Sequence, residues 1–211
     1  MKKIAIVFLL IIMNKVYSQS SEDAKKLLDD VSTNISSFKN IYFDFTYSLN
    51  NKEEQIKQET NGNVTVSGDN YKLNYLGLVQ IFDGKNIYTI IPENEEITIS
   101  KADSENDIGI NPSKLLTFYK SGYNYFMDIK QKHLDKFIQF IKLVPDDKNS
   151  DLNYLLLGID INTKNIFRLI EIGKNETITT LTINNQKTNI ILEKSFFSIN
   201  FDDYPNYYIN N

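Results

Sequence analysis

Ile-Tyr-Phe-Asp-Phe-Thr-Tyr-Ser-Leu is the sequence of residues 41–49, and apolar and polar side chains alternate strictly along it. A period of two residues is typical of a β-strand that has one packed face and one face in water. The packed face of this strand carries Ile41, Phe43, Phe45, Tyr47 and Leu49. The rest of the chain must therefore supply a partner for an aromatic sheet face.

Short strands joined by tight turns follow as far as Ile99. The segments with strand character are 62–66, 71–75, 78–82, 86–90 and 97–99. Asp83-Gly84-Lys85 predicts a hairpin, because the central positions of an Asp-Gly turn tolerate positive φ. We expect an up-and-down antiparallel sheet with one face rich in aromatic residues.

Two helical patterns accompany these strands. Residues 20–36 carry Ala24, Leu27, Leu28, Val31 and Ile35 at a helical period. A second, shorter helix is predicted from Pro112 to Tyr119, with proline at its first position. Each helix could be either an ordinary core helix or a lid over a cavity, and the pattern alone does not distinguish the two.

The second half of the chain returns to strands. They are predicted at 123–127, 136–144, 154–161, 166–172 and 177–183. Residues 190–201 form either a short helix or an edge strand, and residues 202–205 end the ordered part. Regular strand spacing of this kind indicates a barrel or a strongly curved sheet.

The N-terminus predicts export. Met1–Ser18 has two lysines followed by an apolar run, Ile4–Met13, that is too short to span a bilayer stably. We interpret it as a cleaved signal peptide, with an uncleaved anchor as the alternative, and residues 19–211 as a single domain. The chain has no cysteine, so it lacks the residue that lipid anchoring of a bacterial lipoprotein needs, and we expect a soluble envelope protein.

Charge disfavours two classes of partner. The chain has 23 basic and 27 acidic residues, and Arg168 is its single arginine. Loss of the leader would remove three lysines and no acid, which makes the mature chain more negative still. Nucleic acid, which requires clustered cations, and strong docking on an anionic membrane are both disfavoured.

The chain shows little catalytic chemistry. His133, the single histidine, is expected at the surface in a loop, and the absence of cysteine removes thiolate nucleophiles. We therefore predict no catalytic residue, no metal site and no cofactor. A hydrolase remains the alternative from the enzyme class, and its candidate acids are Asp160, Asp202 and Asp203.

Aromatic apolar surface is the feature that remains. Barrels of about this strand number enclose more room than side chains fill, so a ligand cavity is one hypothesis and a filled core, as in a structural module, is the other. By strand parity the candidate cavity residues are Phe43, Phe45, Tyr47, Val64, Val66, Tyr71, Leu73, Tyr75, Ile81 and Tyr88. The candidate lid residues are Leu27, Leu28, Val31, Leu115, Leu116 and Phe118.

The order of these elements resembles the outer-membrane lipoprotein carrier family (LolA-like). The resemblance rests on the leader, the helix, the Phe-x-Phe strand, the Gly-x-Val-x-Val strand, the Asp-Gly-Lys hairpin and the Asn-Pro-Ser-Lys-Leu-Leu helix. Leu143–Asp146 and Phe201–Pro205 look like the Bacteroidetes branch. Better-known members have an arginine near the turn after the second strand that helps fasten the lid, whereas Val66–Asn70 contains none.

The resemblance implies a mainly β fold with α, an incomplete (half-open) antiparallel β-barrel closed by a helical lid, similar to LolA and LppX. It implies a monomeric periplasmic carrier whose cavity receives the acyl chains of lipoproteins. An inner-membrane ABC transporter would release those lipoproteins, and the outer-membrane acceptor is not implied. Another lipid cargo is the alternative within the same class of binding protein.

Overall fold

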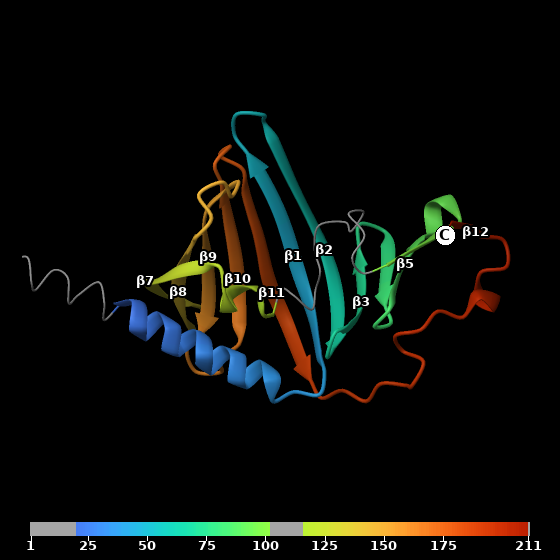
Figure 1. Cartoon of the computed structure of the whole chain (residues 1–211), viewed down its shortest axis with the longest axis horizontal. Coiled ribbons are helices and arrows are strands. Elements are labelled where there is room, and N and C mark those ends of the chain that lie inside the picture. Colours follow the sequence, from blue (N-terminus) through green and yellow to red (C-terminus); the bar gives the residue numbers. More distant parts are fainter. Residues whose placement is uncertain (1–19, 102–115, 211) are drawn as a thin grey trace, which may run out of the picture. The chain divides into compact units, whose positions relative to one another are not determined.

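The computed structural model describes residues 20–101 and 116–210. Within these ranges it contains one α-helix, over residues 20–36, and 12 strands (Figure 1). The hydrogen-bonding order of the strands is β12-β6-β5-β4-β3-β2-β1-β11-β10-β9-β8-β7. The predicted class, a mainly β fold with an open antiparallel sheet and a helix, is confirmed. The predicted leader, Met1–Ser18, lies outside the described residues.

The chain divides into two compact units. The first unit holds the helix together with Asn50–Ile56 and Tyr119–Thr180, and the second unit holds Ser36–Leu49, Lys57–Phe118 and Leu181–Asn211. Strands β1 (Ile41–Asn51) and β11 (Ile178–Thr188) run through both units. Each unit is described by itself.

The second unit is built on the predicted meander. After β1 come β2 (Ile56–Ser67), β3 (Asn70–Tyr75), β4 (Leu78–Phe82), β5 (Asn86–Ile91) and, after the 3-10 turn η1 (Pro92–Asn94), β6 (Glu96–Lys101). The Asp-Gly hairpin forms as expected, because the Asp83 carboxylate accepts hydrogen bonds from the backbone N–H groups of Lys85 and Asn86, both at 2.8 Å. Burial would raise the pKa of Asp83, but these hydrogen bonds outweigh it and lower the pKa.

The C-terminal tail differs from its prediction. Residues 190–201 are neither a helix nor an edge strand, apart from the start of the 3-10 turn η3 (Phe201–Asp203). The ordered chain continues beyond residue 205 to β12 (Tyr208–Asn210), which pairs parallel to β6. Apolar side chains hold the tail on the sheet: Phe197, Ile199, Tyr204 and Tyr207 lie against a cluster of Ile81, Ile90 and Ile97.

The first unit is a four-stranded antiparallel arrangement of β7 (Tyr123–His133), β8 (Lys136–Pro145), β9 (Leu152–Asp160) and β10 (Ile166–Gly173). One face joins Tyr125, Leu143, Leu155 and Glu171, which are paired in register across the four strands. The other face carries a smaller cluster around Ile138, Phe140 and Phe167. Strand β7 is longer than predicted, since it continues from residue 127 to His133.

The helix belongs to the core of the first unit. Its predicted apolar stripe is confirmed, since Ala24, Leu28 and Val31 are buried. Ser20 Oγ accepts a hydrogen bond from the Met127 N–H on β7, and at the far end the Asn34 amide donates to Thr163 O and Asn165 Oδ1. Half of the second predicted helix, residues 112–115, falls outside the described residues, and the other half is not α-helical but forms a turn and the start of the 3-10 turn η2 (Phe118–Lys120).

Candidate functional site

The predicted cargo surface lies on β1 to β4 of the second unit. In the β2–β3 hairpin Val64 pairs with Leu73 and Val66 with Tyr71, and paired residues of antiparallel strands share a face. Ring contacts bring the residues of β1 to the same face. We call this surface the aromatic face, and it comprises Phe43, Phe45, Tyr47, Val64, Val66, Tyr71, Leu73 and Tyr75.

A row of rings crosses the aromatic face. The ring centroids of Phe45 and Tyr75 are 5.9 Å apart, and those of Tyr47 and Tyr75 are 5.7 Å apart in an edge-to-face arrangement. Phe45 reaches Tyr75 across Gly62, where an added Cβ would lie 2.4 Å from the Phe45 ring. Glycine is therefore required at position 62 by the close approach of the ring.

Burial varies along this row. Phe43, Phe45, Tyr71 and Leu73 are buried, whereas Tyr47 and Tyr75 are half-buried. Burial raises the pKa of the Tyr75 hydroxyl, and the nearby Tyr47 raises it further. The two tyrosines thus form the accessible border of an otherwise dry surface.

A buried polar chain adjoins the aromatic face and was not predicted. The Tyr71 hydroxyl donates to Gln80 Oε1 at 2.9 Å, and the Gln80 amide donates to Thr89 Oγ1 at 3.4 Å. Gln80 stands alone between Val79 and Ile81 in an apolar strand, and a lone polar residue in such a strand indicates an internal partner. That pattern could have identified Gln80, although not its partners.

Two predicted cavity residues lie on the opposite face. Ile81 pairs with Lys72 on one side and with Tyr88 on the other, so both Ile81 and Tyr88 alternate away from Tyr71 and Leu73. They pack instead with the C-terminal tail, where the Tyr88 ring contacts Phe201 at 6.3 Å. The register therefore separates these two candidate cavity residues from the other eight, and cargo binding by any of the ten stays a prediction.

The predicted lid residues fall in different parts of the chain. Leu28 and Val31 are buried and Leu27 is half-buried on the helix of the first unit, whereas Leu116 and Phe118 belong to the second unit. Leu115 lies outside the described residues. The structure therefore does not bring the six residues together in one described element, and their role as a lid stays a prediction.

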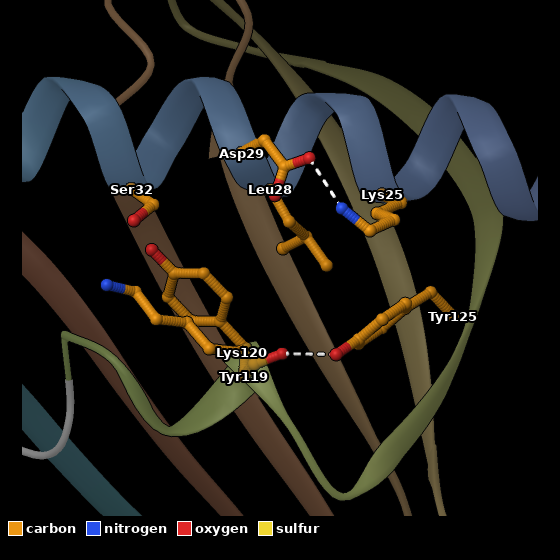
Figure 2. A pocket seen from close by; sticks show the side chains of 7 residues that line it. All are labelled: Lys25, Leu28, Asp29, Ser32, Tyr119, Lys120 and Tyr125. Carbon is orange, nitrogen blue, oxygen red and sulfur yellow. Dashed lines mark hydrogen bonds and ion pairs between the residues drawn. The ribbon is translucent and has the colours of Figure 1, made fainter.

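A pocket of about 210 Å³ lies beneath the helix in the first unit (Figure 2). Its lining residues are Lys25, Leu28, Asp29, Ser32, Tyr119, Lys120 and Tyr125. Sites for drug-sized ligands measure roughly 300–1,000 Å³, so this pocket is too small for the acyl chains of a lipoprotein. It is distinct from the predicted cavity.

Hydrogen bonds and burial set the chemistry of this pocket. The Lys25 ammonium pairs with Asp29 at 2.7 Å, and the Tyr125 hydroxyl donates to the Tyr119 backbone carbonyl at 2.8 Å. Burial raises the pKa of Tyr119 to about 12, with a smaller contribution from Asp29. Both tyrosines therefore stay neutral near neutral pH and can only hydrogen-bond a ligand.

Two of the three candidate acids of the alternative hydrolase accept local hydrogen bonds. Asp160 accepts a hydrogen bond from the Asn162 N–H in the β9–β10 turn, while Asp203 accepts one from the Asn200 amide in the tail. His133 is exposed, as predicted, but lies at the end of β7 rather than in a loop.

Among the described residues no three His, Cys, Asp or Glu side chains are grouped as metal ligands would be. Within residues 20–101 and 116–210 no helix is both long enough and apolar enough to cross a bilayer.

No protein-family model and no curated protein matches this sequence. Solved structures match its fold. An uncharacterized conserved protein from Thermus thermophilus is 11% identical with a TM-score of 0.55, and the match covers 86% of this chain and 96% of that one. LprF from Mycobacterium bovis is 15% identical with a TM-score of 0.51, covering 83% and 98%.

A LolA superfamily protein from Nitrosomonas europaea is 8% identical with a TM-score of 0.44, and the match covers 83% of this chain and 97% of that one. At such identities the likeness concerns the fold alone. The predicted open antiparallel sheet with a helix is shared with the two matches above a TM-score of 0.5, whereas the LolA-like family and its Bacteroidetes branch stay predictions.

Proposed function

We propose that this protein is a carrier of the bacterial envelope that binds lipid acyl chains, those of lipoproteins in the first place, on its aromatic face. The observation that carries the proposal is the row of rings from Phe45 through Tyr75 to Tyr47. Such a surface offers apolar area and few polar groups. The order of elements also resembles a family of lipoprotein carriers, and this resemblance supports the same function.

The energetics of transport require no catalysis. Each methylene removed from water contributes about 0.8 kcal/mol, so an apolar surface alone can hold an acyl chain. Phe43, Phe45 and Leu73 are buried, so cargo reaches them only when the residues packed over them move aside. The free energy that this movement costs offsets part of the binding free energy, which keeps the cargo releasable. We propose that the protein acts in this way without enzymatic activity.

The wider route is part of the same proposal. After cleavage of Met1–Ser18 the carrier is periplasmic, receives lipoproteins from an inner-membrane ABC transporter and delivers them at the outer membrane. Lipid or lipoprotein that co-purifies with the protein, identified by mass spectrometry, would reveal the cargo class.

Binding of a fluorescent fatty acid to the purified protein tests the proposal. Tyr47→Ala and Tyr75→Ala should each weaken binding about tenfold, because a ring that contacts the chain contributes on the order of 1.4 kcal/mol. Tyr42→Ala is the matched control, since Tyr42 is half-buried on the same strand but alternates to the opposite face.

Two results would contradict the proposal. Equal binding by the Tyr47 and Tyr42 variants would place the fatty acid elsewhere. No binding by the unmodified protein would favour the alternative of a filled structural module.

A further inference from the structure

The turn between β7 and β8 exposes apolar side chains to solvent. Within residues 129–137, here called the hairpin tip, Leu134 is 82% exposed, Ile129 is 60% exposed and Phe137 is 43% exposed. The hairpin belongs to the first unit, and Figure 1 labels its two strands, β7 and β8. Exposed apolar residues are ordinary when scattered, but here three of them lie within nine residues of one hairpin.

Leu134 is an unfavourable residue for its own backbone. Its φ is +54°, in the left-handed region where Asn, Asp and Gly are favoured and other residues cost roughly 1 kcal/mol or more. The other non-glycine positions of the first unit with positive φ carry the polar residues Gln55, Lys164 and Glu176, although the second unit has an exposed leucine, Leu76, at such a position. Neither turn geometry nor packing therefore accounts for a leucine here.

Cations lie beside aromatic rings on both sides of this hairpin. The Lys130 ammonium lies 5.6 Å from the centre of the Phe137 ring, and Lys132 pairs in register with Phe137. On the other side of the hairpin Lys136 and Arg168 lie 5.8 Å and 5.0 Å from the Phe167 ring. Three lysines therefore stand against the single acid Asp135 within the tip, so the tip is locally basic although the net charge of −4 disfavours strong docking of the whole chain on an anionic membrane.

Lysines also protect an edge strand from pairing with other chains, and β7 is the last strand in the hydrogen-bonding order of the described residues. That role explains Lys130 and Lys132. It does not explain Leu134, because an apolar residue at the tip of an edge hairpin increases the tendency to associate. A segment that is apolar at its apex and basic around it has the composition of protein segments that bind at a membrane interface.

We propose that the hairpin tip docks on the surface of a membrane that contains anionic phospholipid. Leu134 enters the boundary between headgroups and acyl chains, and the surrounding lysines lie against lipid phosphates. Polybasic segments gain affinity for such surfaces with each Lys or Arg. This inference is independent of acyl-chain binding on the aromatic face, which concerns the second unit.

Co-sedimentation with vesicles tests the proposal on the mature chain. We expect binding to vesicles of phosphatidylglycerol and phosphatidylcholine in equal parts, weaker binding as salt is added, and no binding to pure phosphatidylcholine. A tip that docks into an apolar groove of a protein partner instead predicts no vesicle binding at all. That result, or equal binding to both kinds of vesicle, overturns the proposal.

Charge variants identify the surface. Lys130→Gln combined with Lys132→Gln should weaken vesicle binding about tenfold or more. Lys26→Gln combined with Lys52→Gln changes the net charge equally at exposed positions of the first unit outside the tip, and it should bind nearly as the unmodified protein does. Equal losses in the two pairs would mean attraction by net charge only and would overturn the assignment to the tip.

Leu134→Asn separates docking from folding. Asparagine adopts the left-handed conformation readily, so this variant should melt at the same or a higher temperature than the unmodified protein while binding vesicles about tenfold more weakly. Ile191→Ser removes a fully exposed aliphatic side chain from the second unit and should leave vesicle binding unchanged. Undiminished binding by Leu134→Asn overturns the proposal.

Discussion

At the scale of single residues, Gly62 is the position on which the aromatic face depends most directly. A Cβ there would lie 2.4 Å from the Phe45 ring and 2.7 Å from the backbone oxygen of Asn74. Gly62→Ala should therefore lower the free energy of unfolding by about 1–3 kcal/mol, although alanine is ordinarily the better strand residue. Urea denaturation measures the loss.

A second substitution tests whether the Phe45 ring causes the loss of stability in Gly62→Ala. In a Phe45→Leu background the shorter side chain leaves more room, so Gly62→Ala should cost less there than in the unmodified protein. Additive effects of the two substitutions would show that the backbone of Asn74, rather than the ring, imposes the glycine.

Glu171 is a second informative residue, because its carboxyl group lies on the apolar face that includes Leu155 and Leu143. Burial raises its pKa above the ordinary value of 4.5. The folded state then holds this proton more tightly than the unfolded state does, so the contribution of Glu171 to stability is present below 4.5 and is lost as the pH rises through the raised pKa.

Glu171→Gln should consequently stabilise the protein at neutral pH by about 1 kcal/mol, since it removes a partly buried charge. The gain should shrink as the pH falls towards 4.5, where the glutamate itself becomes neutral. Glu176→Gln, in the exposed β10–β11 turn, is the control. Melting temperatures across this pH range measure both, and a gain that is constant with pH would contradict the assignment.

Residue positions were predictable from the sequence where alternation was strict. Phe43, Phe45 and Tyr47 share a face in β1 as their parity indicates. Ile81 could not be placed, because Ile81 and Phe82 are adjacent apolar residues of β4 and alternation does not show which of them faces the core. Only the pairing of β4 with β3 assigns Ile81 to a face.

At the scale of elements, the C-terminal tail explains why the face of β4 to β6 that carries Ile81, Ile90 and Ile97 is apolar. Tyr204 and Tyr207 pack on the isoleucine cluster, and their ring centroids are 5.0 Å apart. Tyr204→Ala should lower the free energy of unfolding by about 2 kcal/mol, because it removes part of this cover. Tyr208→Ala, whose side chain is exposed on β12, should change it little. Chemical denaturation measures the free energy of unfolding of both variants. Equal losses of stability would mean that the tail stabilises the fold through the pairing of β12 with β6 instead.

The elements that were predicted and those that were missed differ physically. The helix over 20–36 and the strands of the meander carry a period in their own sequence, so local reasoning sufficed. The tail has no period, because its order comes from Phe197 and Ile199 packing on strands that lie far earlier in the chain. The three-residue strand β12 likewise exists only through the edge of β6.

At the scale of the whole molecule, the two compact units share the strands β1 and β11. Unfolding of either unit would remove paired backbone from the other, so we expect one cooperative transition with equal calorimetric and van't Hoff enthalpies. Gly62 in the second unit and Gly158 in the first test this, since a Cβ at Gly158 would lie 2.8 Å from the Phe140 ring. Gly62→Ala and Gly158→Ala should each shift the same single calorimetric peak to lower temperature. Two resolved peaks, each moved by only one of the substitutions, would show that the units unfold independently and that the shared strands do not couple them.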